Sequence, residues 1–118
     1  MANRASTRNM QTIRFVIDAD ASVAPFVYTV GQDVEICEIR TTTTAAIGGG
    51  FVLTLRNGAN QIATVTSAGL LGDVDAALTL DPARTNVAAG GTITAQTNVA
   101  GARLIATIFV LPGVTATS

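Results

Sequence analysis

The chain has 118 residues and a mass of 12.0 kDa, enough for one domain with one hydrophobic core. Hydrophobic residues make up 48% and charged residues only 13%, against a usual ~25%, so the composition excludes a disordered chain. The net charge is −1 and the seven basic residues, all Arg, are scattered, so no nucleic-acid partner is expected.

Residues with β-branched side chains are unusually common: Ile, Val and Thr account for 39 of the 118 residues. Such side chains lose rotamer freedom in helices and pack well on pleated sheets. Apolar and polar residues alternate, and Gly, Asn, Asp and Pro interrupt the pattern. The sequence therefore predicts an all-β domain. Its eight strands are expected at residues 12–18, 25–30, 34–41, 51–55, 61–66, 74–80, 92–97 and 103–111.

The first three strands carry clear signals. Ile13, Phe15 and Ile17 share one face of the first strand. Pro25 opens the second strand, where its missing N–H group does no harm. In the third strand the inward-facing residues change phase at Cys37, which indicates a β-bulge. No charged neighbour would activate the thiol of Cys37, so we expect a small buried hydrophobic residue there.

Glycines and an Asn-Gly pair mark the turns in the middle of the chain. Four consecutive Thr, residues 41–44, lead into three glycines at 48–50, where a loop is expected. Asn57-Gly58 is the strongest local signal, because this pair tolerates positive φ and closes a tight hairpin between the fourth and fifth strands. Gly69 marks a further loop, which leads into the sixth strand.

The sixth strand is expected to end in a capped turn. The side chains that it should point inward are Val74, Ala76, Leu78 and Leu80. Asp81 and Pro82 then match the cap and the first position of one helical turn.

The last strand, 103–111, has apolar residues on both faces. One face consists of Leu104, Ala106, Ile108 and Val110, and the other of Ile105, Thr107, Phe109 and Leu111. A solvated sheet presents a polar outer face, so the second face must be covered, either by the tails of the chain or by another subunit. A domain this small has few residues outside its strands that could cover this face. We therefore predict a homo-oligomer, with a trimer as the expected state and Ile105, Phe109 and Leu111 at its interface.

Eight short strands at this spacing favour a single-domain antiparallel β-sandwich of jelly-roll type. An immunoglobulin-like sandwich is the alternative, and the absence of Trp and of a Cys pair counts against it. We divide the chain into a flexible N-terminal arm (1–11), the sandwich (12–113) and a C-terminal tail (114–118).

Side chains that carry chemistry are scarce. The sequence has no His, no Lys and one Cys, which excludes an imidazole base, a Walker-type phosphate loop and a zinc cluster within one chain. The pairs Asp18/Asp20 and Asp73/Asp75 could attract Ca²⁺, but the other ligands that would complete its about 6–8 oxygens are missing. We expect no enzyme, no metal, no cofactor and no small-molecule substrate. The apolar stretch 104–111 is far shorter than the about 20 residues of a membrane span, so no membrane partner is expected.

Three segments carry a resemblance to a known group of proteins: 26–30 (FVYTV), 52–58 (VLTLRNG) and 78–94 (LTLDPARTNVAAGGTIT). In the last, one strand ends in a Leu-x-Pro-like turn and a Val-Ala-Ala-Gly turn enters the next. In these features, over residues 12–111, the chain resembles the small jelly-roll proteins of tailed bacteriophage heads, which are capsid decoration (cement) proteins and head-fibre domains.

The resemblance implies a trimer that is made in the host cytoplasm and binds the outer surface of the capsid in the virion, where it stabilises contacts between subunits of the major capsid protein. It brings no catalytic residue. Arg4 and Arg8 of the arm could contact an acidic capsid surface or belong to a solvated tail. The alternative function is a fibre or receptor-binding module for a host-surface glycan, against which the scarcity of aromatic residues counts, with Tyr28 as the single Tyr.

Overall fold

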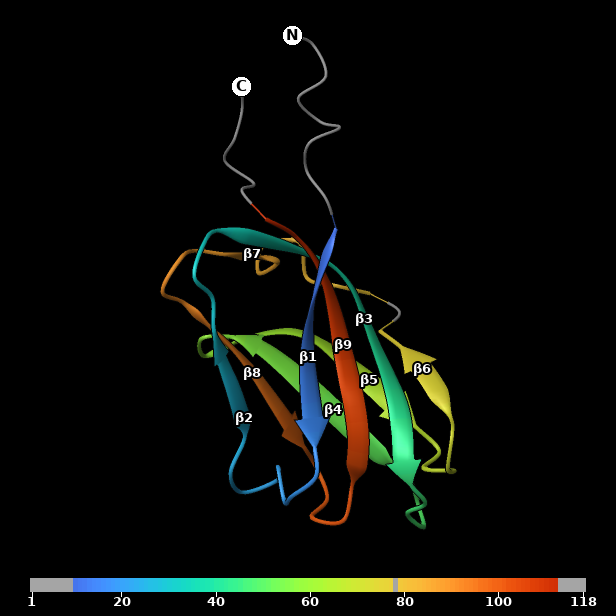
Figure 1. Cartoon of the computed structure of the whole chain (residues 1–118). Helices are drawn as coiled ribbons and strands as arrows, with labels where there is room; N and C mark the ends of the chain where they lie inside the picture. Colours follow the sequence, from blue (N-terminus) through green and yellow to red (C-terminus); the bar gives the residue numbers. More distant parts are fainter. Residues whose placement is uncertain (1–9, 78, 113–118) are drawn as a thin grey trace, which may run out of the picture.

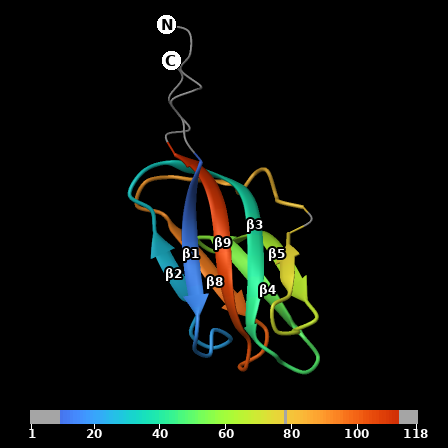
Figure 2. The ribbon, with the colours of Figure 1, turned by 45° about the vertical axis from the view of Figure 1, so that its right-hand side comes forward.

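The structure, a computed structural model, describes residues 10–77 and 79–112. These residues form nine β-strands and no helix, in two antiparallel sheets that pack face to face (Figures 1 and 2). The strands are β1 (Gln11–Ile17), β2 (Phe26–Thr29), β3 (Val34–Ala45), β4 (Phe51–Asn57), β5 (Asn60–Ser67), β6 (Val74–Ala76), β7 (Asn86–Val87), β8 (Thr92–Thr97) and β9 (Arg103–Pro112). The prediction of a compact all-β domain is confirmed. The two-residue strand β7 was not predicted.

The strands pair in a nested order. The β9 sheet has the order β1-β9-β3-β6, with β7 also paired to β3, and the β8 sheet has the order β2-β8-β4-β5. The pairs β1·β9, β2·β8, β3·β6 and β4·β5 enclose one another around the β4–β5 turn. The domain is therefore one long antiparallel hairpin folded into two layers. Because Gln11 pairs with Val110, the chain enters and leaves the sandwich at the same end.

The β4–β5 hairpin follows the Asn-Gly prediction. Asn57 pairs with Asn60, and Gly58 between them has a φ of 62°, which L side chains adopt only with strain. The side-chain amide of Asn57 donates hydrogen bonds to the carbonyl oxygens of Arg84 (3.1 Å) and Asn86 (2.8 Å). These bonds tie the hairpin to the segment that enters β7.

The hydrophobic core fills the space between the sheets. Its largest fully buried side chains are Ile17, Ile39, Leu104 and Ile108 from the β9 sheet and Leu53, Leu55, Ile62, Val65 and Ile93 from the β8 sheet. Full burial of one such side chain contributes roughly 1.5–3 kcal/mol. The two inner faces therefore hold the sandwich together, and the inward alternation that was predicted for the first and last strands is confirmed.

Strand β3 is longer than predicted and contains the expected bulge. It continues through the four Thr residues, of which Thr41 and Thr43 are buried and Thr42 and Thr44 exposed, because β-branched residues suit a strand. The pairing of β3 with β9 shifts between Ile36 and Glu38, which confirms the bulge.

The bulge also corrects the prediction for Cys37. This residue is exposed, whereas a buried position was predicted. Cys37 is the extra residue of the bulge, so its side chain does not point into the core. Ile36 and Ile39, which precede and follow the bulge, remain buried. Its thiol donates a 3.6 Å hydrogen bond to the carbonyl oxygen of Glu35.

Strand β6 is shorter than the predicted strand 74–80, and its facing is reversed. Val74 and Ala76 are exposed, because they pair with Thr42 and Arg40 on the outward side of β3. Of the other two residues predicted to point inward, Leu80 is half-buried against the core and Leu78 lies outside the described residues. The inward assignment of Val74 and Ala76 was wrong.

The segment after β6 forms a turn where one helical turn was predicted. The carboxylate of Asp81 accepts a 3.0 Å hydrogen bond from the N–H of Ala83, and its carbonyl oxygen accepts one of 2.9 Å from the N–H of Arg84. Asp81 therefore caps the turn as expected, but the chain does not continue as a helix.

Candidate functional site

The outer face of the β9 sheet carries large apolar side chains. Ile105, Phe109 and Leu111 point outward from β9, opposite the buried face of the same strand, and each is half-buried. Strand β9 lies between β1 and β3, so these side chains occupy the middle of the face rather than an edge (Figure 1).

Neighbouring strands extend this apolar surface across the sheet. Ile105 pairs with Val16 of β1 on one side and with Thr42 of β3 on the other, and Thr42 pairs with Val74 of β6. Val16 and Val74 are both exposed. The row therefore crosses β1, β9, β3 and β6 and contains one hydroxyl group, that of Thr42. We call this row, together with Phe109 and Leu111, the apolar face.

Charged side chains cross the outer face of the β9 sheet between Ile105 and Phe109. Thr107 of β9 pairs with Arg14 on β1 and with Arg40 on β3, and Phe109 pairs with Glu38. Arg40 and Glu38 form an ion pair with each other, which lowers the net charge that the rows of Thr107 and Phe109 present to a partner. The outer face therefore has an uncharged row at Ile105 and charged residues in the rows of Thr107 and Phe109.

The outer face of the β8 sheet differs in character. Its side chains are mostly hydroxyls and amides, and within the described strands Arg56 is its one charged group. Arg56 donates a 2.7 Å hydrogen bond to the Gln96 carbonyl oxygen, and the Gln96 amide donates one of 3.0 Å to the backbone of Ser22. This polar network is well suited to water, so the two sheets present contrasting surfaces.

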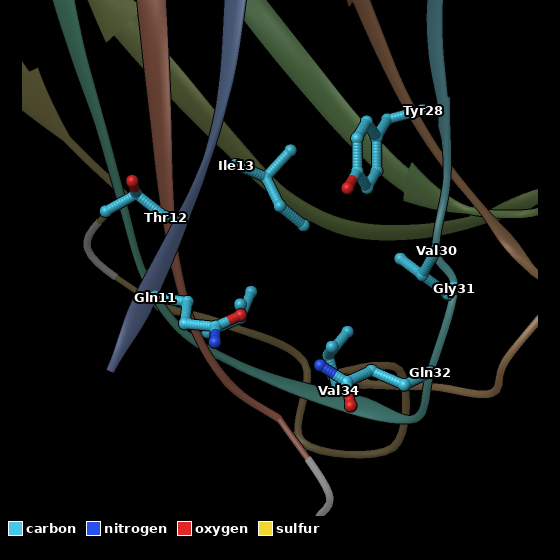
Figure 3. Close-up of a pocket in the computed structure, with 9 residues that line it drawn as sticks. Gln11, Thr12, Ile13, Tyr28, Val30, Gly31, Gln32 and Val34 are labelled. Atoms are coloured by element: carbon cyan, nitrogen blue, oxygen red, sulfur yellow. The ribbon is translucent and has the colours of Figure 1, made fainter. Parts of the chain in front are cut away.

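A groove opens between the edge strands β1 and β2, with a volume of about 340 Å³ (Figure 3). Ile13 on one side and Tyr28 and Val30 on the other point into it, and the amides of Gln11 and Gln32 lie together at one end. The residues that line the groove carry no charge, so its chemistry fits an uncharged ligand. The sequence places Tyr28 and Val30 on one face, but only the fold brings them opposite β1.

Two of the four acidic residues considered as Ca²⁺ ligands, Asp20 and Asp73, accept local hydrogen bonds. Oδ1 of Asp20 accepts hydrogen bonds from the Ser22 hydroxyl (2.5 Å) and N–H (2.8 Å), and these bonds hold the pKa of Asp20 below its usual value. Asp73 Oδ2 accepts a 3.3 Å bond from the N–H of Leu70. Among the described residues, no three His, Cys, Asp or Glu side chains gather as a metal site would require.

One buried polar pair lies at the β3–β6 edge. Asp75 pairs in register with Thr41, and the Asp75 Oδ2 and Thr41 Oγ1 atoms are both buried without a hydrogen-bond partner in the described part of the chain. Each unsatisfied group costs roughly 1–3 kcal/mol. The pair therefore weakens this edge of the sandwich, and it holds too few oxygens for a cation.

The remaining predicted contacts, Arg4 and Arg8, lie outside the described residues, as do most of the predicted arm and the tail at 114–118. No helix in the described part is long and apolar enough to cross a membrane. No protein-family model matches the chain, and no curated protein matches its sequence. The resemblance to capsid decoration proteins therefore stays a prediction from the residues.

Proposed function

We propose that this chain is a structural protein of a phage head: a decoration or cement protein that forms a trimer and binds the outer capsid surface, where it stabilises contacts between major capsid subunits. The observation that supports the proposal is the apolar face, centred on Ile105, Phe109 and Leu111. Large apolar side chains that lie together on the outer face of a sheet are typical of an interaction surface. A second copy on this face would remove these side chains from water.

The strand order supports the jelly-roll assignment on which the resemblance depends. The nested pairs around a central hairpin agree with a jelly roll of eight strands, and the short β7 is a ninth strand, which pairs with β3 in the five-stranded sheet. Jelly rolls occur in viral capsid proteins and in lectins, so the fold agrees with both functions that the sequence left open.

A trimer gives a cement protein a physical advantage. Each subunit needs only a weak contact with the shell, because three linked contacts bind far more tightly than one. In this proposal the apolar face holds the trimer together, and the N-terminal arm, with Arg4 and Arg8, reaches an acidic surface of the capsid.

Removal of the arm tests the capsid contact. A variant that lacks residues 2–9 keeps β1 complete, because β1 begins at Gln11. We expect this variant to remain a trimer but to lose binding to purified phage heads that lack the protein, measured by co-sedimentation. A variant with Arg4→Ala and Arg8→Ala should show the same loss if charge is the reason. Unchanged co-sedimentation of both variants would count against a role for the arm.

A second candidate function is favoured by the groove between β1 and β2. Tyr28 is 44% exposed there, and an aromatic ring beside amide groups can stack on and hydrogen-bond a neutral sugar. If the chain is a glycan-binding module, Tyr28→Ala should weaken binding of a neutral oligosaccharide by about tenfold or more, measured by NMR titration. Val27→Ala, on the opposite side of β2, is the matched control. No shift of the Tyr28 signals with any neutral oligosaccharide would exclude this function.

A further inference from the structure

Two adjacent leucines are exposed on the loop between β5 and β6. Leu70 is 62% exposed and Leu71 is 70% exposed. The loop lies beside the end of β3, where Thr43 pairs with Leu104 near the start of β9, so it is at the opposite end of the sandwich from Gln11 and Val110. We call residues 68–73 the leucine loop.

Hydrogen bonds hold the leucine loop in one conformation. Thr43 exchanges two backbone bonds with it, donating to Asp73 and accepting from Gly72, each at 2.9 Å. The N–H of Ile47 donates to the carbonyl oxygen of Gly69 at 2.8 Å, and Asp73 donates a backbone bond to Leu70 at 3.0 Å. At Gly69 φ is +80°, and a Cβ there would lie 2.4 Å from the Ile47 carbonyl oxygen. The loop therefore cannot turn its leucines inward without breaking these bonds.

A fixed loop with two exposed leucines is suited to binding. Loops at a protein surface usually carry polar residues, and burying one Leu side chain is worth roughly 1.5–3 kcal/mol. Because the backbone is already ordered, an apolar partner gains this contribution with little further loss of conformational entropy.

The leucine loop is continuous with the apolar face. Val74 follows it directly and is 63% exposed, and Val74 is joined in register through Thr42 to Ile105. Leu71 and Leu70 stand three and four residues before Val74 in the chain, so the loop leads directly into the residue where the row of Ile105 ends. The charge of the loop itself is the carboxylate of Asp73, which anionic lipid head groups would repel, so a protein partner fits better than a membrane surface.

We propose that the leucine loop is part of the subunit interface, and that Leu70 and Leu71 of one copy pack against a second copy of this chain. The inference rests on the self-association proposed above. It extends the interface from the centre of the β9 sheet to one end of the sandwich and names the loop that determines how tightly the copies bind.

The test is sedimentation equilibrium of a Leu70→Ser/Leu71→Ser variant. Both side chains lie outside the core, so in the Phe109→Asp background, where association does not add to stability, the two Ser substitutions should leave the thermal unfolding midpoint unchanged. The dissociation constant of the oligomer should rise by about 100-fold. Val23→Ser is the matched control, since Val23 is 80% exposed on the β1–β2 loop, near the same end but at the other edge of the sandwich. The control should associate like the natural chain.

The outcomes separate this inference from the proposed function. If the natural chain associates and the double variant associates equally well, the leucine loop is not in the interface and the proposed function stands. If the natural chain is a monomer, the proposed self-association and the role of the leucine loop in it are both wrong. Flotation with vesicles of phosphatidylcholine and phosphatidylserine tests a membrane surface as the alternative partner. If the natural chain binds the vesicles and the Leu70→Ser/Leu71→Ser variant does not, the assignment of the loop to a second copy is overturned.

Discussion

Phe109→Asp is expected to convert the proposed oligomer into folded monomers. Phe109 lies on the outer face of β9 and pairs in register with Glu38. A carboxylate at this position would be buried by a neighbouring copy beside another acidic residue, and an unpaired buried charge costs several kcal/mol. Each copy in a closed oligomer would meet this cost, so association should be lost at micromolar concentration.

Light scattering coupled to size-exclusion chromatography measures the effect, and Val27→Asp on the outer face of the β8 sheet is the matched control. Val27 is also exposed on a strand, but it lies away from the apolar face. The control should keep the oligomer. A second readout is labelling of the exposed thiol of Cys37, next to Glu38 in the β3 bulge. Labelling should be slower in the oligomer than in the Phe109→Asp monomer, and equal rates would contradict the assigned interface.

Ile108→Ala is expected to lower the free energy of unfolding by about 2–5 kcal/mol. Ile108 is fully buried at the centre of β9, where it pairs with Ile13 of β1 and Ile39 of β3. Removal of its side chain beyond Cβ leaves a cavity between the two sheets. The loss is a large fraction of the total stability of a domain of this size.

Ile105→Ala is the matched comparison, because it makes the same change on the outer face of the same strand. Both substitutions should be measured by urea denaturation in the Phe109→Asp background, so that association does not add to the apparent stability. There, Ile105→Ala should change the free energy of unfolding much less than Ile108→Ala. Equal losses would mean that the outer side chain belongs to the core of a single chain.

Local patterns in the sequence predict the parts of the fold that depend on neighbours along the chain. The two faces of β9 follow from strict alternation, the β4–β5 hairpin from Asn57-Gly58, and the β3 bulge from a change of phase at Cys37. The bulge was correctly located, but the pattern did not indicate that its extra residue is the one that leaves the core. For a bulge, hydrophobicity alone does not show which of two adjacent residues faces inward.

Features that depend on distant contacts were missed. Val74 and Ala76 have the alternation of a core strand, but β6 is an edge strand whose facing is set by its pairing with β3. The groove at Tyr28 exists because β1 and β2, adjacent in the chain, belong to different sheets. The exposure of Leu70 and Leu71 depends on hydrogen bonds from the loop to Thr43 and Ile47. A signal was present in the two glycines that enclose the pair, Gly69 and Gly72, which indicate a tight loop with no room to bury leucines.

The most direct test is the molar mass of the purified natural chain in solution, measured by sedimentation equilibrium from nanomolar to micromolar concentration. If neighbouring copies cover the outer side of the β9 sheet, the mass at micromolar concentration will be three times the 12.0 kDa of one chain and will fall on dilution or after Phe109→Asp. A mass of one chain at every concentration, with Ile105 and Phe109 open to solvent, would contradict the proposal that neighbouring copies cover this face.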